Sequence, residues 1–271
     1  MSDCMSTFKE SLLILLFEFL GTCFLTSLFN SCFQASDLAG LLCGFFILLI
    51  FSARISGSHF NPAITLAFMF RRDTGRFSRL LGLLYIAAQY AGALLGAIIS
   101  YNLFKAAAKK PISVQGRYDA DDKDMDYFYI QSMLAETIGS MLITFLYLTQ
   151  TEEKTKMSSD PAITTLIISA TYAAVVGMGE IQGVMTGSPY NPAAALGLMF
   201  GIIFKGDIEE TKGTWIFLFF AYGGAALAVL LFECVYKKAM AVVENRGDVD
   251  DDDDEGAEHD ALMPPVDPID Q

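Results

Sequence analysis

The chain has few of the residues from which catalytic and metal sites are built. Its 271 residues include two histidines, His59 and His259, and the second lies in an acidic run near the end of the sequence. The five cysteines form no CxxC pair and have no metal-ligand spacing. The sequence also has no glycine-rich phosphate loop and no nucleophile–base arrangement. We therefore expect neither an enzyme nor a cofactor or metal site.

Basic charge is also scarce. Lys and Arg number 18 against 31 Asp and Glu, so the net charge is -13. The segment 244–271 holds twelve acids and one arginine, which leaves the rest of the chain nearly neutral. This balance excludes a basic nucleic-acid footprint. It predicts a solvated acidic tail that could bind a basic partner.

Long apolar runs dominate the remaining chain. Hydrophobic residues make up 53% of the sequence, and six apolar stretches lie at about 11–30, 38–53, 80–104, 130–149, 161–178 and 215–236. Most approach the roughly 20 residues that a helix needs to cross a bilayer. The pattern predicts an all-α membrane protein with six transmembrane helices. Glu18 and Glu136 lie inside the first and fourth stretches, and we expect these carboxylates to face the protein interior with partners, because exposure to lipid is costly.

One tripeptide occurs twice, as Asn61-Pro62-Ala63 and Asn191-Pro192-Ala193. Asn is a favoured N-cap and Pro suits the first helical position, so each copy predicts a helix start. The apolar runs that follow, Pro62 to Phe70 and Pro192 to Phe204, are too short to cross. About 10 residues at 1.5 Å each span half of a roughly 30 Å core. The two copies therefore predict two half-helices that meet end to end near the midplane.

The two halves of the chain repeat. Glu18-Phe19-Leu20-Gly21-Thr22 matches Glu136-Thr137-Ile138-Gly139-Ser140, and three spans per half force the second half to be inverted. We expect a first membrane repeat over 1–105, an acidic outer loop over 106–129, a second repeat over 130–240 and the acidic tail over 241–271. Lys and Arg number eleven in the loops on the N-terminal side and seven on the other, which favours both termini on the cytoplasmic side.

The first bend, Ser56-Gly57-Ser58-His59-Phe60-Asn61-Pro62-Ala63-Ile64-Thr65, resembles the first loop of the aquaporin (major intrinsic protein) family almost letter for letter. Residues 89–93 and 223–228 resemble the third and sixth helices of that family, and the likeness runs from Glu10 to Lys237. The resemblance implies a passive channel for water or small uncharged solutes such as glycerol, urea or ammonia. In such a pore, Asn61 and Asn191 would direct amide N–H groups at the permeant, and His59 would offer a polar contact on the inner half.

The second bend departs from the family pattern. The family continues Asn-Pro-Ala with Arg, whereas this chain has Ala194 and then Ala195. Counting from the two Asn residues places the outer filter at Leu41, Gly179, Ser188 and Ala194, a set that is wide, weakly polar and uncharged. Three interpretations stay open: the pore admits small neutral solutes, Glu180 fills the gap, or conduction is lost and the fold serves as an accessory subunit of a larger membrane complex.

Partners and location follow from these interpretations. The lipid bilayer is the expected surroundings, and a homotetramer is the expected assembly of a channel, in the plasma or vacuolar membrane. Under the accessory interpretation the partners would be unrelated membrane subunits, and the mitochondrial inner membrane becomes a candidate location.

Overall fold

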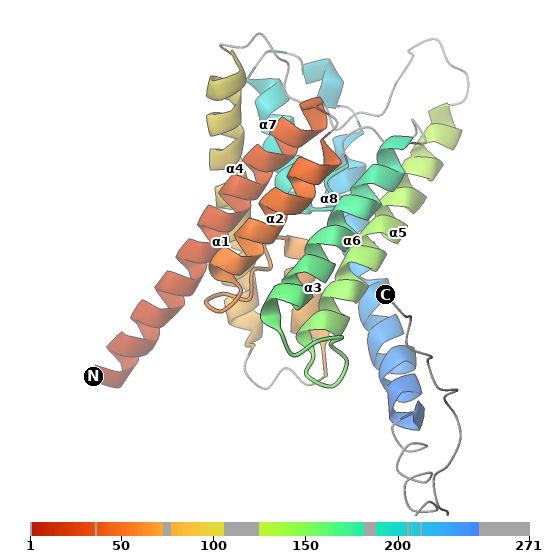
Figure 1. The fold of residues 1–271 in the computed structure, drawn as a ribbon. Helices are drawn as coiled ribbons and strands as arrows, with labels where there is room; N and C mark the ends of the chain where they lie inside the picture. Colours follow the sequence, from red (N-terminus) through yellow and green to blue (C-terminus); the bar gives the residue numbers. More distant parts are fainter. Residues whose placement is uncertain are drawn as a thin grey trace, which may run out of the picture.

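A computed structural model describes residues 2–35, 37–72, 77–105, 125–181, 188–204, 206, 208–211 and 213–243. The elements are α1 (Ser2–Ala35), α2 (Leu38–Ser52), α3 (Pro62–Phe70), α4 (Arg79–Lys105), α5 (Met125–Thr151), α6 (Pro161–Ile181), α7 (Pro192–Ile203), the short 3₁₀ helix η1 (Ile208–Thr211), α8 (Thr214–Leu231) and the π-helical turn η2 (Phe232–Tyr236). They form one helical bundle, with the short helix α3 in its lower part and α7 in its upper part (Figure 1).

The predicted spans agree with the helices. In the described part of the chain, five helices are long and apolar enough to cross a membrane, and they match five of the six predicted stretches. The sixth, α2, has 15 residues and so a length of about 22 Å, which is short for a full crossing. Helix α5 begins at Met125, inside the predicted outer loop 106–129. The rest of that loop, and the predicted tail beyond residue 243, lie outside the described residues.

The two halves of the bundle are built alike. Helix α1 packs on α4 as α5 packs on α8, and each half-helix packs on the last helix of the other half, α7 on α4 and α3 on α8. The two halves also match in individual close contacts between helices. A Cβ atom added at Gly92 would lie 2.1 Å from the carbonyl oxygen of Phe19, and one added at Gly224 would lie 2.3 Å from that of Thr137. Since Phe19 and Thr137 each follow the glutamate of their half, the fold is the inverted repeat that the sequence predicted.

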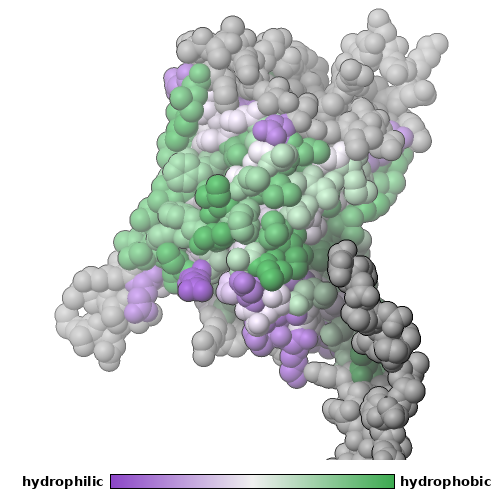
Figure 2. Space-filling view, viewed as in Figure 1, coloured by the Kyte–Doolittle hydropathy of each residue, from purple (hydrophilic) through white to green (hydrophobic). Residues whose placement is uncertain are grey.

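The outside of the bundle is apolar. Large side chains such as Leu103, Leu134 and Phe219 are mostly exposed. Figure 2 shows hydrophobic residues across the middle of the visible face, with hydrophilic residues gathered toward its upper and lower ends. This is the distribution that a lipid-embedded helical bundle requires, because lipid contacts the apolar band and water contacts the ends.

An ionic cluster joins three segments beyond the C-terminal end of the half-helix α3. Arg71, which follows α3, forms an ion pair with Glu152. The Nζ of Lys237 lies 3.7 Å from Glu152 and 3.2 Å from Glu233. Arg71 and Lys237 also lie over the ring of Phe232, at 5.6 and 5.2 Å from its centroid. Glu152 thus fixes the C-terminal end of α3 against the end of α8.

Candidate functional site

Both Asn-Pro-Ala tripeptides begin helices, as predicted. Asn61 caps α3, and its Oδ1 accepts a hydrogen bond from the backbone N–H of Ala63 at 2.9 Å. Asn191 caps α7, and its Oδ1 accepts from Ala193 at 3.1 Å and from Ala194 at 3.3 Å. Pro62 and Pro192 take the first helical positions. Each bend thereby presents a helix N-terminus, with its partial positive charge, to the interior of the bundle.

The two caps are also bonded across the gap between the bends. Asn61 Nδ2 donates to the carbonyl oxygen of Tyr190 at 2.9 Å, and Asn191 Nδ2 donates to that of Phe60 at 2.8 Å. A side-chain amide carries two N–H donors, so each Asn has one committed to the opposite bend and a second that can bind another acceptor. The sequence predicted amides directed at the permeant, but it did not predict that each would first hold the other bend in place.

An aromatic ring precedes each Asn and is lodged against a glycine. Phe60 and Tyr190 both adopt a left-handed backbone with φ of 47°, and both rings are buried. A Cβ atom added at Gly21 would lie 1.9 Å from Phe60 Cε1, and one at Gly139 would lie 2.2 Å from Tyr190 Cε1. The glycine in each Glu-x-x-Gly segment therefore makes the space for the ring that anchors the bend. The repeated spacing was visible in the sequence, but this partner was not.

Glu18 organises the first bend. It is fully buried, and each of its carboxylate oxygens accepts two hydrogen bonds. Oε1 accepts from Ser56 Oγ at 2.6 Å and from the N–H of His59 at 3.0 Å. Oε2 accepts from the N–H of Phe60 and from Gln89 Nε2, both at 2.8 Å. These four donors provide the interior partners that the sequence predicted for this carboxylate.

Glu136 occupies the matching place in the second half with fewer partners. It is also fully buried, and its Oε2 accepts a hydrogen bond from Ser188 Oγ. Its Oε1 has no hydrogen-bond partner among the described residues. The N–H of Tyr190, which matches the Phe60 donor, bonds Ser188 Oγ at 3.3 Å instead, and two sequence differences remove two further donors. Pro189 replaces His59 and has no N–H to donate, and Ala221 replaces Gln89 when the halves are aligned on Gly92 and Gly224.

His59, predicted as an inner-pore residue, is surrounded by four aromatic side chains. It is 4% exposed, and its Nδ1 lies 3.2 Å from Thr65 Oγ1. The rings around it are Phe68, Phe77, Tyr85 and Tyr147, with centroids between 4.3 and 6.0 Å from that of His59. The imidazole is thus enclosed by aromatic rings.

The predicted filter residues that the structure describes are buried too. Leu41 is 1% exposed, Ser188 4% and Ala194 0%. Leu41 and Ala194 belong to one apolar cluster with Phe29, Phe45 and Tyr172. Gly179 lies near the C-terminal end of α6, and its surroundings, like the side chain of Glu180, lie outside the described part of the structure. The three described positions are thus buried, and the width of the filter stays a prediction because the surroundings of Gly179 are not described.

Besides Tyr85 on α4, which donates to the carbonyl oxygen of Ser56 at 2.8 Å, two tyrosines bind the backbone carbonyls of the bends. Tyr172 on α6 donates its hydroxyl to the carbonyl oxygen of Pro189. Tyr147 on α5 donates to the carbonyl of Gly57 and, at 3.0 Å, to that of Ser58. Sequence reasoning missed both, because nothing distinguishes a tyrosine that faces the bends from one that packs elsewhere in an apolar helix.

The chain is similar to known proteins over most of its length. The model of the family "Major intrinsic protein" matches residues 2–232. The probable aquaporin PIP2-8 of Oryza sativa subsp. japonica is 29% identical over 205 residues, which are 72% of this chain and 67% of the relative. Aquaporin-5 of Homo sapiens is 27% identical over 179 residues, 66% of this chain and 60% of the relative. The chain thus spans about two thirds of the length of these curated relatives.

The fold has a counterpart among solved structures. The X-ray structure of the aquaglyceroporin from Plasmodium falciparum superposes with a TM-score of 0.70 at 18% identity, covering 86% of this chain and 99% of that one. At this identity the likeness concerns the fold alone. The family match over residues 2–232 and the apolar helices identify the chain as an integral membrane protein of the major intrinsic protein family.

Proposed function

We propose that the chain is a passive transmembrane channel for water and small uncharged solutes, with a path that runs past both Asn-Pro-Ala bends. The observation that carries this proposal is the meeting of two helix N-termini, capped by Asn61 and Asn191, inside the bundle. Each N-terminus contributes about half a positive charge, which opposes cations and protons. The remaining amide donor of each Asn would hydrogen-bond the oxygen of a passing water molecule.

Neutral solutes are the substrate class that fits the filter positions. Leu41, Gly179, Ser188 and Ala194 carry no charge, and the position of the family's arginine is Ala194. Without that cation the outer filter has no strong donor for a passing oxygen, so selection would rest on size and weak polarity. On the inner side His59 is the polar contact closest in sequence to Asn61. We infer permeation by glycerol, urea or ammonia as well as water.

A test uses the purified protein in lipid vesicles. Shrinkage after an osmotic step reports water permeability, and reswelling with glycerol or urea as the osmolyte reports solute entry. The channel proposal expects faster rates than in empty vesicles for water and for at least one solute, without a proton or cation current. Rates equal to those of empty vesicles for all three permeants would contradict it.

A structural role as an accessory subunit is the second candidate. The observation that favours it is the burial of the residues at the two bends: Asn191 and Ala194 are 0% exposed and Asn61 is 1% exposed. Under this alternative, the protein extracted in mild detergent would copurify with unrelated membrane subunits in fixed stoichiometry. A homotetramer without other subunits would contradict it and would agree with the channel proposal.

Orientation and assembly belong to the same proposal. In Figure 1, the N-terminal end of α1 and the end of the helix that continues α8 lie at the same end of the bundle. The arginine and lysine bias of the loops favours a cytoplasmic position for that end. We infer a homotetramer in the plasma or vacuolar membrane, with the mitochondrial inner membrane as the location under the accessory alternative.

A further inference from the structure

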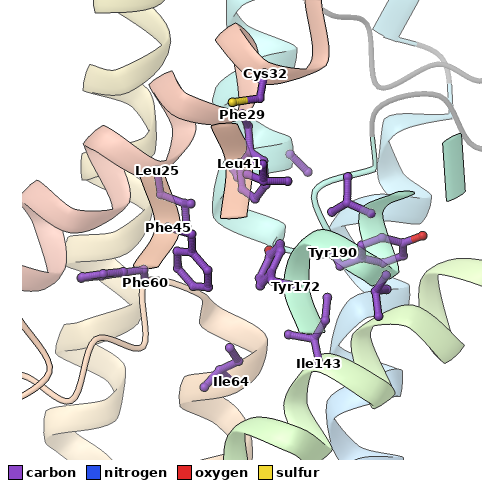
Figure 3. Packing of buried hydrophobic residues seen from close by; sticks show 14 of the residues in the cluster. Leu25, Phe29, Cys32, Leu41, Phe45, Phe60, Ile64, Ile143, Tyr172 and Tyr190 are labelled. Atoms are coloured by element: carbon purple, nitrogen blue, oxygen red, sulfur yellow. The ribbon is translucent and has the colours of Figure 1, made fainter. Parts of the chain in front are cut away.

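The space between the two bends holds a side chain from α6. The ring of Tyr172 lies against Phe45 of α2, with centroids 4.9 Å apart in an edge-on contact, and against Phe29 of α1, at 5.6 Å. Figure 3 shows Phe45 and Tyr172 facing each other, with Phe60 on one side and Tyr190 on the other. Phe60 and Tyr190 are the residues that precede the two Asn caps, so the ring lies at the level of the bends.

The hydroxyl of Tyr172 makes the contacts that a permeating water molecule would make. It donates to the carbonyl oxygen of Pro189 in the second bend. It also interacts with the side chains of both Asn191 and Asn61. A water molecule at the midplane would likewise receive hydrogen bonds from the two amides and donate one to a bend carbonyl.

Little room for water remains beside the ring. Tyr172 and Leu41 are each 1% exposed, and Asn191 and Ala194 have no exposed surface. Side chains that border an open file of water would keep surface in contact with a water-sized sphere. These four residues come from α2, α6 and the second bend with α7, so the burial extends over three of the elements beside the bends.

We propose that Tyr172 closes the path between the two bends, with its hydroxyl in the position of the midplane water, and that it sets the basal permeability of this protein. The ring packs against Phe29 and Phe45, and its hydroxyl is bound to the carbonyl oxygen of Pro189. Passage of water requires the side chain to leave this position. The inference rests on the proposed function, since it assumes that the bends border a permeation path.

Tyr147 also donates its hydroxyl to bend carbonyls, but to those of the first bend, and no contact joins it to Asn61 or Asn191 among the interactions described. Its hydroxyl binds the carbonyls of Gly57 and Ser58, and its ring contacts His59 and Phe68. It therefore provides a matched control on the other side of the bends. Removal of its hydroxyl alone, in Tyr147→Phe, leaves the ring of Tyr172 in place.

The experiment compares osmotic shrinkage of vesicles that hold equal amounts of wild type, Tyr172→Val, Tyr172→Phe and Tyr147→Phe. Tyr172→Val removes the ring, and we expect a rise in water permeability of about tenfold over wild type. Tyr172→Phe keeps the ring but loses its bond to Pro189, so we expect a smaller rise than in Tyr172→Val, and the smallest change in Tyr147→Phe, which leaves Tyr172 itself unaltered. Tyr172→Leu, which retains more apolar volume, is measured alongside in case the valine variant folds poorly. Circular dichroism and a single size-exclusion peak establish folding.

The outcomes separate the inference from the proposed function. A fast Tyr172→Val with a slow but measurable wild type supports both. A fast Tyr172→Val with wild type at the rate of empty vesicles supports closure by Tyr172 and contradicts a channel role for the native chain. Equal rates for Tyr172→Val and a conducting wild type overturn the closure and leave the channel proposal standing. Folded Tyr172 variants and wild type all at the rate of empty vesicles overturn both.

Discussion

Asn61 and Asn191 each secure the bend that carries the other. The Nδ2 of Asn61 bonds the carbonyl that precedes Asn191, and the Nδ2 of Asn191 bonds the carbonyl that precedes Asn61. Both residues are fully buried. Because each Asn also caps its own half-helix, one side chain connects two local structures that lie 130 residues apart.

Asn61→Ala should therefore destabilise the protein markedly. The change removes a helix cap, worth about 1 kcal/mol, and leaves a buried carbonyl unpaired at a cost of about 1–3 kcal/mol. We expect a loss of about 2–4 kcal/mol in the free energy of unfolding, measured in mixed detergent micelles. Asn102→Ala is the control, because Asn102 is exposed and bonds its own helix at Ile98. Equal losses in the two variants would refute the cross-bend role.

Glu18→Gln and Glu136→Gln should differ although the two carboxylates occupy matching places. In Glu18 both oxygens accept hydrogen bonds, so an amide NH₂ would face two donors, and we expect a loss of about 2–3 kcal/mol in unfolding free energy. In Glu136, Ser188 binds one oxygen and the other has no partner among the described residues. Glutamine can keep that acceptor, so the loss should stay below about 1 kcal/mol. Chemical unfolding of the two variants checks this, and the reverse order would contradict the account.

Gly224→Ala should separate α5 from α8, whereas Gly223→Ala should not. A Cβ atom at Gly224 would lie 2.3 Å from the carbonyl oxygen of Thr137, while one at Gly223 would meet nothing within 4 Å. Overpacking of this kind costs about 1–3 kcal/mol, but alanine at an open helical site stabilises by up to about 1 kcal/mol. Thermal unfolding in detergent measures both. A stable Gly224→Ala variant would show that the two helices are farther apart than described.

Glu152→Gln should lower the stability of the contact between the C-terminal end of α3 and the end of α8. Glu152 pairs with Arg71 and lies 3.7 Å from Lys237, and its side chain is 18% exposed. Partial burial strengthens this cluster relative to a surface pair, and we expect a loss of about 1–2 kcal/mol in unfolding free energy. The neighbouring Glu153 is the control, because its side chain is 85% exposed in its pair with Lys156. Glu153→Gln should change stability by less than about 0.5 kcal/mol, and a larger effect than at Glu152 would contradict the cluster.

The sequence predicted features that depend on neighbours along the chain. Apolar runs predict the long helices, and the chemistry of Asn and Pro predicts the starts of α3 and α7 at Pro62 and Pro192. The inverted repeat followed from an odd number of spans per half. These inferences succeed because each depends on local pattern or on counting.

Contacts between distant residues could not be predicted in the same way. Tyr172 has the same local pattern whether its ring faces lipid, a helix or the bends, and its role depends on Phe29, Phe45 and Pro189 together. The filter shows the same limit. Small residues at Ser188 and Ala194 suggested width, but both are buried, and Ala194 belongs to an apolar cluster with side chains from other helices.

In the channel proposal, the two bends and the helices around them border one route across the membrane. The most direct test of this claim is the water permeability of Tyr172→Val vesicles compared with the double variant Tyr172→Val, Leu41→Trp. Leu41 lies in the same apolar cluster as Tyr172, so a tryptophan there should refill the route. We expect the double variant, shown to fold, to return to the wild-type rate. A double variant that stays as fast as Tyr172→Val would show that water crosses elsewhere, and it would contradict the claim.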